Sequence, residues 1–215
     1  MDSELDKIPL REKKYATLKL KILDCLISKL ESKSFEEVSV KEMAKELEIS
    51  EMTFYNYFKN KKELLVYFIE LWNIEMNRSV DLAKPLSSVE AIFLIYDLTA
   101  TKIEENHQFM MEIIAFVALN GIPKKDLKIS KAEVILKFGS YFDYEEGGFR
   151  ELILPLLSSA TQDAEIESQD LQTLFVSLHN TFFATPLLVD KSNVNDIREL
   201  YKNQLSKILK IKGKK

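Results

Sequence analysis

Residues 50–62 gather side chains suited to contacting a nucleic-acid duplex. Thr53, Tyr55 and Asn56 lie within four residues of one another, and Glu51 is the only acid in this segment. A threonine methyl can contact a thymine methyl, a tyrosine hydroxyl can reach a phosphate oxygen, and an asparagine amide can pair with an adenine edge. The segment therefore indicates non-covalent recognition rather than catalysis. The alternative is that both tyrosines, Tyr55 and Tyr57, only cover the hydrophobic core.

Two short helices must hold these side chains. Ser39 and Glu42 have the spacing of a capping box, in which the Ser39 hydroxyl and the Glu42 carboxylate each accept a backbone N–H from the other residue. Ser50 is placed to cap a second short helix over residues 51–58, and Phe54 and Phe58 can pack inward from it. Helices this short are unstable alone and need the flanking helices as support. The pattern predicts a helix-turn-helix between Ser39 and Phe58.

The distribution of charge matters more than the net charge of −4. Residues 1–62 hold 13 basic and 12 acidic side chains, whereas the rest of the chain holds 17 and 22. Residues 7–21 contain six basic side chains and one acid, and Lys59, Lys61 and Lys62 form a second basic group. These groups are suited to phosphate contacts. The alternative is that they are only solvated helix ends.

One motif is more specific than these patterns. The chain reads VSVKEMA over 38–44 and ISEMTFYNYFKNKKELL over 49–65. The most specific part is Tyr55-x-Tyr57-Phe58-x-x-Lys61-x-Glu63-Leu64. This stretch resembles the N-terminal region of TetR-type repressors.

The resemblance implies roles for the matching residues. Thr53, Tyr55 and Asn56 would face bases or groove edges, and Ser39, Tyr57 and Lys61 would hold phosphates. The DNA-facing set that we expect comprises Ser39, Ser50, Met52, Thr53, Tyr55, Asn56, Tyr57 and Lys61. Glu48 and Met52 depart from the family, which usually has glycine in the turn and glycine or a small residue at the Met52 position. Glu48 must therefore adopt a left-handed backbone or a different turn, and Met52 must make its own contact or shift the helix outward.

The rest of the chain predicts more helices. Only 5 Gly and 5 Pro occur, with 46% hydrophobic residues, which favours long helices with few loops. We expect an all-α fold: a three-helix helix-turn-helix domain over 1–65 and a larger helical ligand-binding and dimerisation domain over 66–215. The expected helices cover residues 10–32, 88–105, 108–119, 131–138, 149–164, 168–185 and 196–209, with a fourth N-terminal helix from about residue 64.

Polar side chains on or beside apolar helices are candidates for ligand contacts, because a buried polar group needs a partner. They are Tyr96, His107, Asn120, Tyr141, His179 and Asn180. The alternative is that each is satisfied within the core or an interface. Nearby Phe, Met and Ile side chains suit an apolar ligand.

Other function classes find less support. There is no glycine-rich phosphate loop, metal-ligand spacing or nucleophile elbow, so we expect no enzyme, cofactor or metal. Cys25 is the only cysteine and falls on an apolar helix face, which predicts a small buried side chain. No apolar stretch is long enough to span a bilayer, and we expect a cytoplasmic protein.

We therefore expect a DNA-binding transcriptional regulator. Following the family's usual behaviour, it would be a repressor that binds operator DNA as a homodimer and is released by a small apolar ligand. The alternative is a helical interaction protein without specific DNA binding.

Overall fold

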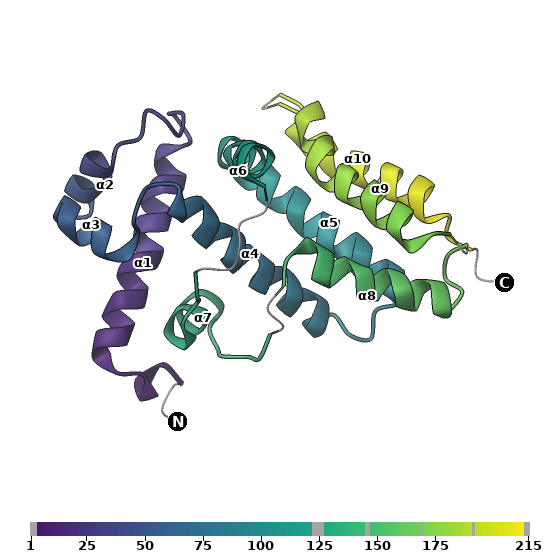
Figure 1. Cartoon of the computed structure of the whole chain (residues 1–215), viewed down its shortest axis with the longest axis horizontal. Helices are drawn as coiled ribbons and strands as arrows, with labels where there is room; N and C mark the ends of the chain where they lie inside the picture. Colours follow the sequence, from purple (N-terminus) through teal and green to yellow (C-terminus); the bar gives the residue numbers. More distant parts are fainter. Residues whose placement is uncertain (1–3, 122–126, 145–146, 168, 191, 213–215) are drawn as a thin grey trace. The chain divides into compact units, whose positions relative to one another are not determined.

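The computed structural model describes residues 4–121, 127–144, 147–167, 169–190 and 192–212. These residues form an all-α fold (Figure 1). The α-helices are α1 (Leu10–Lys29), α2 (Val40–Glu46), α3 (Glu51–Tyr57), α4 (Glu63–Leu82), α5 (Ser88–Glu105), α6 (His107–Asn120), α7 (Lys131–Phe138), α8 (Phe149–Gln162), α9 (Leu171–Ala184) and α10 (Ile197–Leu209). Short 3-10 helices are η1 (Glu4–Lys7), η2 (Thr185–Leu188) and η3 (Val194–Asp196).

Most helices lie where the sequence places them. The predicted bounds of the helices over 88–105 and 131–138 are confirmed without change, and those of the others differ by a few residues. The first helix ends at Lys29 rather than Ser32, and α8 begins at Phe149 and continues through Pro155. The expected start of α9 at Ser168 lies outside the described residues, and the observed helix begins at Leu171.

The chain forms two compact units that do not follow sequence order. One contains the N-terminal residues to Trp72 together with Glu112–Asp143, and the other contains Asn73–Met111 with Tyr144 onward. Helices α4 and α6 each run through a unit boundary, and α7 belongs with α1–α3. The division of the chain into independent domains at residue 65 stays a prediction.

The core of the N-terminal unit uses the predicted apolar faces. Ile22 and Leu26 of α1 are fully buried, and Phe54 and Phe58 are fully buried beside them in the unit's core. The inward direction of the two phenylalanines is thus confirmed. Cys25 is also buried, and burial together with the neighbouring Glu46 raises the pKa of its thiol to about 11. The predicted role as a small buried side chain is confirmed.

A buried ion pair joins α1 to α7. The Lys19 Nζ lies 2.9 Å from the Glu133 carboxylate, and the two side chains are only 5% and 2% exposed. The ammonium also lies 4.3 Å from the centre of the Tyr67 ring of α4, which adds a cation–π contact. A pair this deeply buried needs both partners, because either charge alone would be left without compensation.

The second unit is built on α5. Helices α8 and α10 both pack on α5, and α9 packs on α8 and α10. Aromatic rings fill the space between them: Tyr96 lies edge-on to Tyr201 and Phe182, with centroids 5.1 and 5.5 Å away. Their hydroxyl groups are satisfied, since Tyr96 donates to the Leu178 carbonyl and Tyr201 to the Phe182 carbonyl.

Candidate nucleic-acid interface

Serine side chains cap both short helices. The Ser39 hydroxyl accepts from the Glu42 N–H at 3.1 Å, and the Ser50 hydroxyl accepts from the Thr53 N–H at 3.0 Å. The predicted capping box at α2 is therefore half present. The Glu42 carboxylate does not return to Ser39 but accepts from Lys29 and Lys33, at 3.1 and 2.7 Å. Two lysine ammonium groups compete with one backbone N–H for the carboxylate, and this ties α2 to the end of α1.

The turn between α2 and α3 depends on Glu48. Its φ is 54°, which is the left-handed conformation that the missing glycine predicts. The Ile49 N–H donates to the Ala44 carbonyl at 2.9 Å and closes the end of α2. A side chain at such a position costs about 1 kcal/mol relative to glycine. The turn keeps its geometry without glycine and carries this strain.

The outer face of α3 presents polar and apolar side chains to solvent. Met52 is 71% exposed and Tyr55 48% exposed, while Asn56 is also exposed. Thr53 is half-buried, with its hydroxyl 2.8 Å from that of Ser50. Since Phe54 is fully buried, the helix has one face in the core and the opposite face open. Tyr55 therefore does more than cover the core.

Tyr57 has a different environment. Its ring stacks on that of Tyr15 from α1, with centroids 4.4 Å apart and an interplanar angle of 18°. Burial, with smaller effects from Glu133 and Tyr57, raises the pKa of the Tyr15 hydroxyl. The stacked rings hold α3 against α1, and Tyr15 lies within the basic segment of residues 7–21. The sequence pattern did not indicate Tyr15, because its partner is 42 positions away.

Lys61 points inward. Its ammonium donates to the Phe35 carbonyl and, at 2.7 Å, to the Val38 carbonyl, and it lies 4.2 Å from the centre of the Phe35 ring. Burial lowers its pKa, against the opposing effect of Glu36 and Glu112. Two of the three ammonium donors thus hold the loop before α2, and one remains for a phosphate. The phosphate role of Lys61 stays a prediction. The neighbouring Lys59 and Lys62 are exposed.

The residues expected to bind a ligand do not gather at one place. Asn120 and Tyr141 belong to the N-terminal unit, and both are exposed. In the second unit, His107 meets the Val189 carbonyl at 3.2 Å, and Asn180 is exposed. His179 lies among phenylalanine rings, the nearest being Phe183 at 4.8 Å. Burial lowers the pKa of its imidazole, against a hydrogen bond to Asn180.

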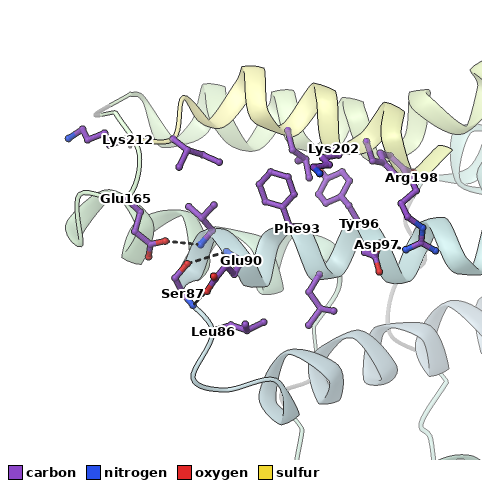
Figure 2. Close-up of a pocket in the computed structure, with 15 residues that line it drawn as sticks. Leu86, Ser87, Glu90, Phe93, Tyr96, Asp97, Glu165, Arg198, Lys202 and Lys212 are labelled. Atoms are coloured by element: carbon purple, nitrogen blue, oxygen red, sulfur yellow. Dashed lines mark hydrogen bonds and ion pairs between the residues drawn. The ribbon is translucent and has the colours of Figure 1, made fainter. Parts of the chain in front are cut away.

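Tyr96, the sixth of these residues, lines a pocket of about 770 Å³ in the second unit (Figure 2). The pocket lies between α5 and α10, and the segment after α10 closes one end. Charged side chains that sequence reasoning did not select border it, among them Arg198, Lys202 and Lys212. They fall on the polar side of an amphipathic helix and on the C-terminal tail, where solvated lysines are expected.

Comparison with known proteins agrees with the geometry of α2 and α3. Residues 22–68 match the family model described as "Bacterial regulatory proteins, tetR family". This span contains both short helices, both caps and Lys61. Residues 22–68 thus have the sequence of a TetR-type DNA-binding segment. This match indicates a DNA-binding transcriptional regulator.

Solved structures share the fold over most of the chain. FadR of Thermus thermophilus, a TetR-family transcriptional repressor in complex with lauroyl-CoA, is 18% identical, with a TM-score of 0.61 over 89% of this chain and 93% of its own. FadR of Bacillus subtilis, in complex with stearoyl-CoA, is 19% identical, with a TM-score of 0.56 over 88% and 97%. A putative fatty acid metabolism regulator of Clostridium perfringens is 16% identical, with a TM-score of 0.53 over 88% and 96%. No protein of curated function matches the sequence.

The described part of the chain lacks two other kinds of feature. None of its described helices is both long and apolar enough to cross a membrane. Over the same residues, His, Cys, Asp and Glu side chains form no group of three or more that could hold a metal ion.

Proposed function

We propose that the chain binds operator DNA as a homodimer through the outer face of α3, and that a small apolar ligand releases it, so that it acts as a repressor. The exposed face carrying Met52, Tyr55 and Asn56 is the observation on which the proposal rests. Thr53 would meet bases at the edge of this face, while Ser39, Ser50, Tyr57 and Lys61 would hold the flanking phosphates. The N-termini of α2 and α3 favour such anion contacts.

A homodimer requires a surface outside the DNA-binding residues. Helix α9 offers one, because Val176 is exposed there and Phe183, seven residues later on the same face, is half-buried. Leu187 and Leu188 in the following η2 are each 65% exposed. These apolar side chains support a symmetric contact through α9 and η2. The two copies of α3 would then read half-sites about one helical turn, roughly 34–36 Å, apart.

Ligand control needs a connection between the ligand-binding part and the DNA-binding helices. Within the N-terminal unit, the Glu112 carboxylate of α6 accepts from the Phe35 N–H at 3.2 Å, and Phe35 also holds Lys61. Glu133 of α7 holds α1. Because α4 and α6 extend into both units, a ligand that favours one arrangement of these helices would change operator affinity. Coupling of this kind is typically worth about 1–3 kcal/mol.

The similar FadR proteins of Thermus thermophilus and Bacillus subtilis were solved in complex with lauroyl-CoA and stearoyl-CoA. This supports a ligand with an aliphatic chain for the present protein. Such a chain suits a second unit whose interior is lined by Phe, Tyr and Leu side chains.

The test is an electrophoretic shift with DNA from upstream of the chain's own gene. Asn56→Ala should weaken specific binding by about 1–3 kcal/mol, because one base contact is lost. Asn203→Ala, an equally small change at an exposed asparagine of α10, should leave binding unchanged. Binding should also weaken steeply as salt increases. No shift at low salt with any promoter fragment would instead support a helical interaction protein.

A further inference from the structure

We propose that the pocket between α5 and α10 binds an amphipathic organic anion, namely an aliphatic chain with one negatively charged head. The proposal deepens the proposed function and rests on it for the regulatory consequence, because it names a site and a ligand class for the controlling molecule. The binding itself can be measured without DNA.

The size and floor of the pocket suit an aliphatic chain. Its volume of about 770 Å³ lies in the range of about 300–1,000 Å³ that is typical of small-molecule sites. Val89, Tyr96, Tyr201 and Leu205 form a buried apolar floor, and Phe93 projects from α5 toward α10 above it (Figure 2). Buried apolar surface of this kind gains free energy when an aliphatic chain displaces water from it.

The two tyrosines do not make the floor polar. The Tyr96 hydroxyl donates to the Leu178 carbonyl at 2.7 Å, and the Tyr201 hydroxyl donates to the Phe182 carbonyl at 2.8 Å. Both carbonyls belong to α9, which is not among the pocket's walls. With their hydroxyl groups engaged there, the tyrosines contribute ring surface to the pocket.

The acidic groups at the pocket already have donors. The Glu165 carboxylate accepts from the Ser88 and Val89 N–H groups at 3.2 and 3.1 Å. Glu90 accepts from the Ser87 N–H at 2.8 Å, and Asp97 pairs with Arg198.

The two lysines differ from these acids. Within the described residues, the Lys202 and Lys212 ammonium groups form no ion pair. Three acidic and three basic side chains line the pocket, and the Lys202 and Lys212 ammonium groups are the ones among them that are left to pair with an anionic head.

The position of Lys212 follows from the fold. Its N–H donates to the Glu165 carbonyl at 2.9 Å, and Ile211 pairs with Ile166 in an isolated antiparallel bridge. These contacts bring Ile211 and Lys212 to the end of the pocket where Leu86 lies, and both Ile211 and Leu86 are exposed. An aliphatic chain entering at this end would cover two exposed apolar side chains and place its head near an ammonium.

The experiment is isothermal titration calorimetry of the full chain with dodecanoate, dodecanoyl-CoA and dodecyltrimethylammonium. We expect one dodecyl anion per chain, bound at least about tenfold more tightly than the cation of the same chain length. Binding by dodecanoate indicates that a carboxylate suffices as the head, and binding by dodecanoyl-CoA alone indicates phosphate. The double variant K202Q/K212Q should bind the anion about tenfold more weakly. The matched double variant K137Q/K207Q removes two exposed lysines outside the pocket and should bind like the unchanged chain.

Leu86→Trp places a larger side chain at the exposed end of the pocket and should also weaken binding. Equal binding of anion and cation, equal binding by the two double variants, or no binding up to about 1 mM would overturn the proposal. Such a failure would leave the DNA shift of the unchanged chain intact. Loss of that shift would instead refute the proposed function, whatever the calorimetry shows. If both proposals hold, dodecyl anions should weaken the shift in the unchanged chain and less so in K202Q/K212Q.

Discussion

At the scale of residues, local rules explain where side chains begin and end helices, and long-range contacts explain their final partners. Ser39 and Ser50 accept the backbone N–H groups that their positions predict. Glu42 does not make the contact that its position alone suggests, and Lys61 makes contacts that its position does not suggest. Glu42 is drawn to Lys29 and Lys33, and Lys61 to the Phe35 and Val38 carbonyls. A long charged side chain can reach several partners, and only the tertiary structure shows which of them it binds.

The left-handed backbone at Glu48 leads to a prediction about stability. Glu48→Gly should raise the free energy of unfolding by about 0.5–1 kcal/mol, because glycine adopts a φ of 54° without the steric cost of a side chain. Urea denaturation followed by circular dichroism measures this change. Glu48→Ala keeps a side-chain carbon in the same conformation and should not produce the gain. If the glycine variant were no more stable than the alanine variant, strain at the turn would not be significant.

At the scale of elements, α7 is held in the N-terminal unit by the ion pair of Glu133 with Lys19. The sequence of α7 alone does not predict this contact. Its capping box between Ser130 and Glu133 is a local feature, with the Ser130 N–H donating to the Glu133 carboxylate at 2.8 Å. The same carboxylate receives the Lys19 ammonium. Glu133 therefore both starts α7 and fixes it to α1.

This ion pair leads to a second prediction. Lys19→Met should lower the free energy of unfolding by about 3–5 kcal/mol, because it leaves a buried carboxylate without its cation. The double variant K19M/E133Q should recover most of this loss, since glutamine removes the charge and can still accept from the Ser130 N–H. Chemical denaturation provides the measurement.

The exposed pair of Lys84 and Asp81 supplies the control. The two side chains are 70% and 60% exposed, so Lys84→Met should change stability by less than about 1 kcal/mol. A double variant as unstable as K19M would show that Lys19 acts through packing rather than through its charge.

At the scale of the whole molecule, each of the two compact units combines segments that are not consecutive in the sequence. The N-terminal unit takes in α7 and the second half of α6, while α4 and α6 belong to both units. A ligand in the second unit therefore has covalently continuous helices through which to act on the first. The proposed homodimer adds a further requirement, because both copies of α3 must meet one duplex.

The dimer contact leads to a third prediction. The double variant L187E/L188E should convert the dimer to a monomer, since two charges would be placed in an apolar interface. Light scattering after size-exclusion chromatography measures the mass, and the operator shift should weaken in parallel. Leu82→Glu alters an exposed leucine of α4 and should leave the dimer intact. If L187E/L188E kept its dimeric mass, the contact would have to lie elsewhere.

The sequence by itself determined the helical class, the helix positions to within a few residues, the two serine caps and the outward face of α3. These depend on the spacing of apolar residues and on hydrogen bonds that span three or four positions, so the information is local. At Glu48 the sequence left two alternatives, a left-handed backbone or a different turn, and the structure shows the left-handed one.

Only the tertiary structure decided which distant residues meet. The stacking of Tyr15 on Tyr57, the pairing of Lys19 with Glu133 and the inward course of Lys61 join positions from 23 to 114 residues apart. The pocket likewise combines α5 with α10 and the C-terminal tail, so single polar residues on apolar helices could not predict it. Pattern and propensity specify which face of a helix is buried, but the partner of a long charged side chain depends on how the helices pack.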